Sequence, residues 1–314
     1  MTRKEKIAIR AKRIAARDIR MAQRRGEVPK EPVKPVKEHV EPVKEPIKDK
    51  WADARAIQAK KVAEAKAILE KEPLKDKLTI EICIHCYHYQ HRLCWMLSSI
   101  LQQKGDVPNI IVNISYAPNN GDPITEEVCK FFREQGLNIK ETVVLEKEAS
   151  NRAIARNKQV AETTADWILF SDSDMVYDPE LFSDLQQQLK TNLRTETRVM
   201  GGDRHSMDIN FCVKFFEEDA TVYPCVIPNV ADITSKWPLR WVTGKGTAPG
   251  NFQLANVKAI QIIRGGKYTE RTGDVWRRTK SDRAFRVGQG GRVRIEIKKQ
   301  FHLNHDRGGP EIQR

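Results

Sequence analysis

Between residues 78 and 171, short apolar segments alternate with helical segments, and this alternation constrains the fold more than any other feature. The sequence predicts strands over residues 78–87, 109–115, 138–145 and 166–171, with helices between them over residues 90–103, 124–135 and 150–162. Such a series predicts parallel strands joined by crossover helices. We therefore expect an α/β fold built on a mostly parallel, doubly wound sheet. A further helix should begin at Asp178-Pro179 and run to about residue 190.

The last strand of this series ends in two carboxylates. Trp167 to Phe170 is a continuous apolar run, typical of a strand buried on both faces, and Asp172-Ser173-Asp174 follows it closely. Ligands of open α/β sheets bind beyond the carboxyl ends of the strands. An Asp-x-Asp at that place offers oxygen ligands to a hard divalent cation such as Mn²⁺ or Mg²⁺. The alternative is a simple strand-end turn, since Asp and Ser are common in turns.

The positive charge is concentrated at the N-terminus. The formal net charge is +13, and residues 1–77 hold 23 Lys+Arg against 13 Asp+Glu. This stretch predicts a basic helix over 3–25, an extended spacer of Glu-Pro-Val-Lys repeats over 31–48, and a second helix over 51–69. We interpret residues 1–77 as a helical, basic N-terminal arm that either binds a polyanion such as nucleic acid or forms a solvated tail.

The remaining sequence, residues 78–314, predicts one domain with two halves, over 78–178 and 179–314. Residues 1–25 lack the apolar core of a signal peptide, and no run approaches the roughly 20 apolar residues of a membrane span. Six cysteines in 314 residues do not form a disulfide scaffold and fit a reducing compartment. We expect a cytoplasmic protein.

The helix before the acidic strand carries Ala155-Arg156-Asn157. With this helix, the apolar strand and Asp172-Ser173-Asp174 in order, residues 78–307 resemble the GT-A nucleotide-sugar glycosyltransferases, especially those of the inverting family-2 type. The resemblance implies a Rossmann-like GT-A fold, with a nucleotide-sugar half over 78–178 and an acceptor half over 179–314. It also implies an enzyme that moves a sugar from a nucleoside diphosphate sugar, a UDP-sugar in the first place, to an acceptor hydroxyl. The N-terminal arm lies outside the resemblance.

The resemblance also implies roles on the donor side. Asp174 is expected to hold the metal ion, and Asp172 to lie nearer the ribose or a water molecule on the metal. Arg152 and Arg156 are expected to clamp the diphosphate, although charges on a helix surface are the alternative for each. The family binds the nucleoside beyond the first strand, where Tyr87 or His88 could face the base.

On the acceptor side, residues 244–254 match the expected glycine-containing loop. The family has an acidic pair at the start of the helix that carries the catalytic base, and here Ser281 replaces the first acid. Asp282 is therefore our candidate base, with Asp274 as the rival and an N-cap role as the alternative for either. The predicted strand over 293–301 ends at His302, which we prefer to His305 as a further metal ligand.

One cluster of side chains suggests a different site, because Cys and His are the usual ligands of zinc. It comprises Cys83, His85, Cys86, His88, His91 and Cys94. However, Cys83 and Cys86 are three residues apart on a predicted strand and should point to opposite faces. No second Cys or His pair with ligand spacing follows, so we favour a first strand and its loop over a zinc site.

The acceptor is not encoded in the predicted site. The basic arm favours a polyanionic acceptor, and hydroxylated bases in phage DNA are one example by analogy. Such a base would have to be flipped out or single-stranded. A non-catalytic GT-A scaffold with a nucleic-acid-binding arm is the main alternative, but both Asp172 and Asp174 are present. A nucleotidyltransferase should have a glycine-rich loop after the first strand, whereas residues 86–91 contain no glycine.

Overall fold

A computed structural model describes most of the chain from residue 52 to residue 200 and several later segments. The described residues are 52–87, 90–118, 123–149, 151–200, 204–207, 224–227, 239–242, 252–269, 285, 293–294 and 300–302. The predicted basic helix over 3–25 and the spacer over 31–48 lie outside these ranges. The chain divides between Lys50 and Trp51, and the elements below belong to the second unit.

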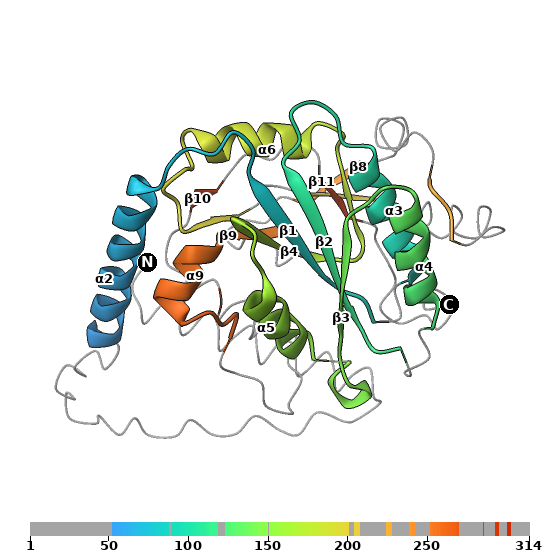
Figure 1. Cartoon of the computed structure of the whole chain (residues 1–314), viewed down its shortest axis with the longest axis horizontal. Coiled ribbons are helices and arrows are strands. Elements are labelled where there is room, and N and C mark those ends of the chain that lie inside the picture. The colour runs from blue at the N-terminus through green and yellow to red at the C-terminus, as the bar shows by residue number, and fades with distance from the viewer. Residues whose placement is uncertain are drawn as a thin grey trace, which may run out of the picture. The chain divides into compact units, whose positions relative to one another are not determined.

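The core of the protein is a seven-stranded sheet with strand order β10-β6-β9-β4-β1-β2-β3 (Figure 1). Its strands are β1 (Thr79–His85), β2 (Asn109–Tyr116), β3 (Ile139–Val143), β4 (Trp167–Asp172), β6 (Arg198–Met200), β9 (Phe252–Asn256) and β10 (Val293–Arg294). β1 lies at the centre of the parallel part and pairs with β2 on one side and β4 on the other. β9 alone among these strands runs antiparallel to its neighbours. The predicted mostly parallel α/β sheet is confirmed.

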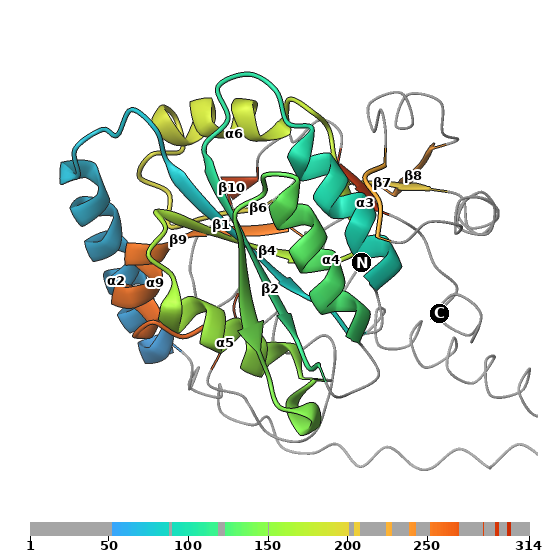
Figure 2. The same cartoon turned by 45° about the vertical axis from the view of Figure 1, so that its right-hand side comes forward.

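Helices cover both faces of this sheet (Figures 1 and 2). They are α3 (Gln90–Leu101), α4 (Pro123–Glu134), α5 (Arg152–Glu162), α6 (Leu181–Lys190) and α9 (Val257–Arg264), with a short 3₁₀ turn at Glu146–Glu148. Side chains alternate across a strand, so Ile82 packs with α3, α4 and α6, whereas Cys83 packs with α5 and α9. Within the described part of the chain, no helix is long and apolar enough to cross a membrane.

A second sheet of four strands, in the order β5-β11-β7-β8, begins directly after β4. Its strands are β5 (Met175–Tyr177), β11 (Gln300–His302), β7 (Arg204–Met207) and β8 (Leu239–Val242). Only Ser173 and Asp174 separate β4 from β5. The chain therefore passes from one sheet to the other at the Asp-Ser-Asp sequence.

The helix α2 (Ala52–Lys71) packs against α9 (Figure 1). Ala65 and Leu69 of α2 are buried in one cluster with Ala259 and Ile263 of α9. An ion pair of 2.5 Å between Glu72 and Lys258 joins the end of α2 to the start of α9. The sequence predicted this helix but grouped it with the N-terminal arm, whereas its packing makes it part of the folded unit.

The structure differs from the sequence-based expectation at the glycine-containing segment. Residues 252–254 were predicted to end an acceptor loop, but they form the first part of β9. β9 is buried along its whole length because it pairs with β4 on one side and β6 on the other. The loop prediction was wrong for these residues because local glycine content does not reveal a pairing with a strand 85 residues away, as between Leu254 and Leu169. The rest of the predicted loop lies outside the described residues.

Candidate active site

The Asp-Ser-Asp turn lies at the carboxyl edge of the seven-stranded sheet. Asp172 is the last residue of β4 and is paired in register with His85, the last residue of β1. The two carboxylates differ in exposure: the Asp172 side chain is 29 % exposed, whereas Asp174 is 6 % exposed. Asp172 is therefore the more open of the two.

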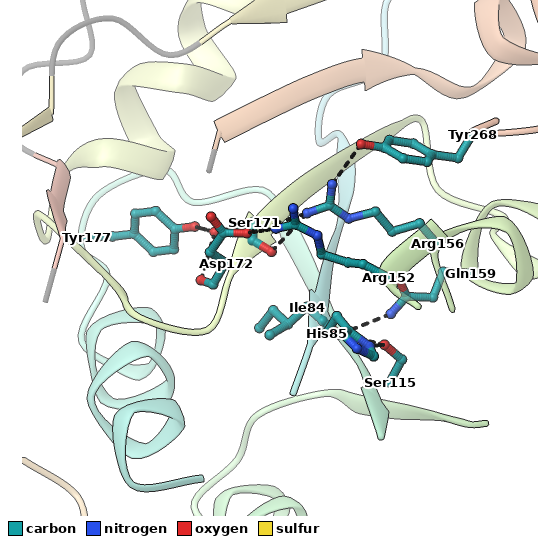
Figure 3. Close-up of polar contacts among 10 residues, drawn as sticks. All are labelled: Ile84, His85, Ser115, Arg152, Arg156, Gln159, Ser171, Asp172, Tyr177 and Tyr268. Carbon is teal, nitrogen blue, oxygen red and sulfur yellow. Dashed lines mark hydrogen bonds and ion pairs between the residues drawn. The ribbon is translucent and has the colours of Figure 1, made fainter. Parts of the chain in front are cut away.

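Two arginines of α5 approach Asp172 (Figure 3). Arg152 Nη1 donates to Asp172 Oδ1 over 2.7 Å, and Arg156 Nη2 lies 3.7 Å from the same oxygen. The Asn151 side chain accepts a hydrogen bond from the Ala153 amide and so caps the start of α5. Residues four apart on a helix lie on the same face, which explains why both guanidinium groups reach the end of β4.

The two arginines have different surroundings. The Arg152 side chain is 25 % exposed, but that of Arg156 is completely enclosed. The Arg156 guanidinium carbon lies 5.3 Å from the centre of the Phe170 ring and 5.1 Å from that of Tyr268. Its Nη1 donates to the Tyr268 hydroxyl over 2.7 Å. The phosphate contact expected for Arg156 would therefore require neighbouring side chains to move, whereas Arg152 already reaches the surface.

The backbone brings the predicted histidine ligand to the turn. β11 runs antiparallel to β5, with His302 opposite Met175, the residue that follows Asp174. Directly opposed residues in antiparallel strands have Cα atoms about 4.5–5.5 Å apart. The strand register thus places His302 beside the Asp-Ser-Asp turn, although these residues are far apart in the sequence. His305 lies outside the described residues.

Hydroxyl groups on either side of the turn are joined. Ser171 Oγ and Tyr177 Oη lie 2.6 Å apart, so a hydrogen bond links the end of β4 to the end of β5. The Tyr177 amide donates to Ser99 Oγ of α3 over 3.1 Å. Burial raises the pKa of Tyr177 above its ordinary value, so its phenol is neutral at physiological pH. These bonds hold both ends of the turn.

His85 is held by its neighbours at the end of β1. Its Nε2 lies 2.7 Å from the Ala149 carbonyl oxygen and donates to it, and its Nδ1 lies 3.0 Å from Ser115 Oγ. Burial is the main cause that lowers the pKa of His85 to about 4, and the positive charges of Arg152 and Arg156 act in the same direction. His85 is therefore a neutral, fixed ring at pH 7 and not a free metal ligand.

The described cysteines of the Cys and His cluster belong to two different hydrophobic clusters, and the side chains of His88 and His91 lie outside the described residues. Cys83 packs with Ile168 and Phe170, whereas Cys86 belongs to the core on the opposite face of the sheet. Burial raises the pKa of the Cys83 thiol well above its ordinary value, which disfavours the thiolate that zinc requires. Among the side chains that the structure describes, no three His, Cys, Asp or Glu residues gather as a metal site. The geometry agrees with a first strand and its loop.

The remaining predicted residues fall into two groups. Tyr87 is half-buried and packs against Ala117, Val144, Ala149 and Ala155 near the ends of β2 and β3. His88, Asp274 and Asp282 lie outside the described residues. The sequence missed Tyr268, which completes the surroundings of Arg156 from 112 residues further along the chain. Nothing in the local sequence around Tyr268 indicates that contact.

Residues 81–198 match the family model described as glycosyl transferase family 2. Over this segment the chain is similar to the family-2 glycosyltransferases. The matched segment runs from β1 to the start of β6 and includes Arg152, Asp172 and Asp174. No curated protein matches the sequence.

Solved glycosyltransferase structures resemble the domain. TarS residues 1–349 from S. aureus, in complex with UDP-GlcNAc, has 12 % sequence identity and a TM-score of 0.48, covering 75 % of this chain and 60 % of that one. The mannosyltransferase PcManGT from Pyrobaculum calidifontis, in complex with GDP-Man and Mn²⁺, has 15 % identity and a TM-score of 0.48, covering 82 % of this chain and 68 % of that one. The chain thus spans about 60 % of the length of TarS 1–349.

Proposed function

We propose that the protein is a metal-dependent glycosyltransferase that moves a sugar from a nucleoside diphosphate sugar to an acceptor hydroxyl, with inversion at the anomeric carbon. A UDP-sugar is our preferred donor. The observation that carries this proposal is the Arg152–Asp172 pair at the strand end of a domain that matches family 2. Both acidic residues of the Asp-Ser-Asp turn are retained, which argues against a purely non-catalytic scaffold.

The residues at the turn suit a divalent cation such as Mn²⁺ or Mg²⁺. Asp172 and Asp174 offer carboxylate oxygens, and the register of β5 and β11 supports His302 as a nearby nitrogen ligand. These three residues would hold the ion, with His305 as the alternative to His302. When bound, the ion supplies positive charge close to the diphosphate leaving group.

Arg152 is the residue best placed to meet the donor phosphates. Its side chain is partly exposed and already donates to a carboxylate oxygen, so a donor phosphate would offer it another anionic acceptor. Arg156 would contribute to donor binding indirectly, because its buried positive charge lies 3.7 Å from the Asp172 carboxylate. Tyr87 and His88, beyond the end of β1, remain our proposed contacts to the nucleoside.

The acceptor hydroxyl needs a base as it attacks the sugar. We assign this role to Asp282, with Asp274 as the rival, by resemblance to the family. The base would take the proton from the acceptor hydroxyl on the face of the sugar opposite the diphosphate, which inverts the anomeric centre. Departure of the diphosphate is then balanced by formation of the new bond to the acceptor oxygen.

The basic N-terminal arm supports a polyanionic acceptor. Residues 1–25 hold 10 Lys+Arg against 2 Asp+Glu, a density of charge that favours binding to phosphate backbones. DNA with hydroxylated bases is our proposed acceptor class, in a cytoplasmic setting. The proposal of a sugar transferase does not depend on this choice.

A donor hydrolysis assay tests the proposed activity without knowledge of the acceptor. The full-length protein is incubated with a panel of nucleoside diphosphate sugars and MnCl₂, and released nucleoside diphosphate is measured. We expect slow release from one donor, lost in EDTA and in the Asp174→Asn variant. If the wild-type protein releases no more nucleotide than that variant for every donor, the proposal fails.

A further inference from the structure

Three aromatic rings meet beneath the strand end that carries Asp172. Tyr268 and Phe285 stack with ring centres 4.6 Å apart, and Phe170 of β4 lies 4.6 Å from Tyr268 and 5.2 Å from Phe285. All three side chains are fully buried. We call Phe170, Tyr268 and Phe285 the aromatic platform. It joins three parts of the chain that are distant in the sequence.

Arg156 connects this platform to Asp172 (Figure 3). Its guanidinium contacts the faces of Phe170 and Tyr268, and it donates to the Tyr268 hydroxyl. An arginine remains charged in proteins, and a buried charge is costly unless neighbouring groups compensate it. The compensation comes from the Tyr268 hydroxyl, the Ser171 carbonyl at 3.4 Å and the Asp172 carboxylate. The position of Asp172 therefore depends on a group that solvent does not reach.

The next residue, Asn157, holds the chain beside Tyr268. The Thr269 amide donates to Asn157 Oδ1 over 3.0 Å, and Asn157 Nδ2 donates to the Thr269 carbonyl over 2.7 Å. The Asn157 side chain thus bonds to both backbone polar groups of Thr269, as a neighbouring strand would. α9 ends at Arg264, and the next residue, Gly265, has a φ of 59°, the left-handed conformation that favours glycine. The residues after it reach α5. Arg156-Asn157 therefore binds Tyr268-Thr269 as a unit.

The aromatic platform includes residues from both sides of the two candidate bases in the sequence. Thr269 and Phe285 stand on either side of the sequence stretch that contains Asp274 and Asp282. Tyr268, next to Thr269, stacks directly on Phe285, so the residues on both sides of that stretch are anchored on the platform. The same platform supports Arg156 and, through it, Asp172.

We propose that Arg156 and Asn157 are positioning residues, which set the donor-side carboxylate Asp172 and the chain at Tyr268-Thr269 in a fixed relation. Neither touches the donor in this role. The Tyr268 hydroxyl and the Asn157 amide thus control the rate of sugar transfer without contributing to nucleotide affinity. The effect on transfer rests on the proposed function, whereas the mechanical link between Tyr268 and Asp172 does not.

The Tyr268→Phe variant isolates this link, because it removes the hydroxyl and keeps the stacked ring. We measure kcat and KM for donor turnover, and the Kd of UDP and GDP with MnCl₂ by calorimetry. The expected result is a fall in kcat of about tenfold or more with the nucleotide Kd unchanged within about twofold, since a small displacement of a reacting group lowers the rate strongly. Asn157→Ala should show the same pattern. Tyr116→Phe is the matched control, because it removes a hydroxyl bonded to Glu141 on β3, and its kcat should equal that of the wild type.

Two results would overturn the proposal. One is a wild-type kcat in Tyr268→Phe. The other is a loss of nucleotide affinity of about tenfold in Arg156→Lys, because that would make Arg156 a direct ligand of the donor.

A double-mutant cycle tests the link without any turnover. Tyr268→Phe, Asp172→Asn and the double variant are unfolded in urea, and the three shifts of the midpoint are compared. If the two residues are linked, the midpoint of the double variant should shift by clearly less than the sum of the two single shifts. Additive shifts would overturn the positioning role. If the wild type hydrolyses no donor while the cycle is non-additive, the proposed activity fails and the link stands.

Discussion

The guanidinium of Arg152 lies 2.7 Å from the carboxylate of Asp172, where β4 leaves the seven-stranded sheet. This ion pair joins the first residue of α5 to the first acid of the turn. Both side chains are about a quarter exposed, so a ligand can reach them. A donor phosphate would compete with Asp172 for Arg152, while a cation would compete with Arg152 for Asp172. Binding of the donor and of the metal at this turn should therefore be mutually supportive.

Arg152→Ala should weaken the binding of UDP or GDP with MnCl₂ by at least about tenfold, since a charge-assisted hydrogen bond to a ligand contributes about 1.5–3 kcal/mol. The free energy of unfolding should change little, because a partly exposed ion pair stabilises a protein by about 0–1 kcal/mol. Calorimetry and thermal unfolding measure the two effects. Lys158→Ala is the matched control, since Lys158 lies on the same helix as Arg152 but pairs with Glu148 of the 3₁₀ turn and not with Asp172. Equal nucleotide affinity in both variants would contradict the role of Arg152.

Asp174→Asn should lower donor turnover by at least about 10²-fold while keeping the fold, because the amide preserves the shape of a side chain that is largely buried. EDTA should remove the activity of the wild type, and added MnCl₂ should restore it. Asp178→Asn, four residues further on and directly after β5, serves as the control. Turnover that survives both EDTA and Asp174→Asn would exclude a metal at this turn.

The sequence predicts the parallel half of the sheet well because its signals are local. The continuous apolar run from Trp167 to Phe170 identified a strand buried on both faces, and β4 lies between β1 and β9. The acidic turn was recognised because Asp172 and Asp174 follow that run directly. The alternation of strands and helices from β1 to β4 then defines the topology, since right-handed crossovers leave few arrangements.

The parts that the sequence did not predict depend on contacts between distant segments. The direction of β9 is not encoded in Phe252–Asn256, because strand propensity reflects side-chain packing in context and does not specify which way a neighbouring strand runs. The enclosure of Arg156 depends on Tyr268, and no residue close to Arg156 in the sequence indicates this contact. The docking of α2 escaped notice for a similar reason. Only Ala65 and Leu69 of that helix are buried, and this is too narrow an apolar stripe to stand out among its charged residues.

The packing of α2 on α9 predicts how truncations behave. Removal of residues 1–50 should leave the unfolding temperature unchanged, whereas removal of residues 1–77 should lower it, because Ala259 and Ile263 of α9 lose their cover. Leu69→Ala should cost about 2–3 kcal/mol in the free energy of unfolding, as expected for a buried leucine. Ile57→Ala on the same helix is the control, since Ile57 is 61 % exposed and its loss should change stability by less than about 0.5 kcal/mol. Equal stability of the two truncations would contradict this packing.

His85 predicts a loss of stability in weak acid. Its pKa is lowered to about 4 in the folded protein, below the value near 6.5 of the unfolded chain, so the unfolded state binds the extra proton first. The contribution of His85 to the free energy of unfolding is fully present above pH 6.5. It is lost as the pH falls towards 4, by at most about 1.4 kcal/mol per pH unit. Urea unfolding at pH 7 and pH 5 measures it. His85→Gln, whose amide nitrogen can still donate to the Ala149 carbonyl, should lose less stability over this interval than the wild type. Equal losses in both proteins would assign the pH dependence to other groups.

The N-terminal arm predicts salt-dependent binding to nucleic acid. Each phosphate neutralised by a basic residue releases counterions, and the logarithm of the binding constant for duplex DNA then falls by about 0.9 per contact for each decade of salt. The 10 Lys+Arg of residues 1–25 should therefore make binding of the full-length protein steeply dependent on KCl. The protein without residues 1–50 should bind more weakly and with a flatter slope, and its donor hydrolysis should be unchanged because α2 and the active site remain. A full-length variant with the basic residues of 1–25 replaced by glutamine separates charge from length, and it should behave like the truncation. Equal slopes for the full-length and truncated proteins on single-stranded and duplex DNA, or no binding at low salt, would remove nucleic acid as the partner of the arm.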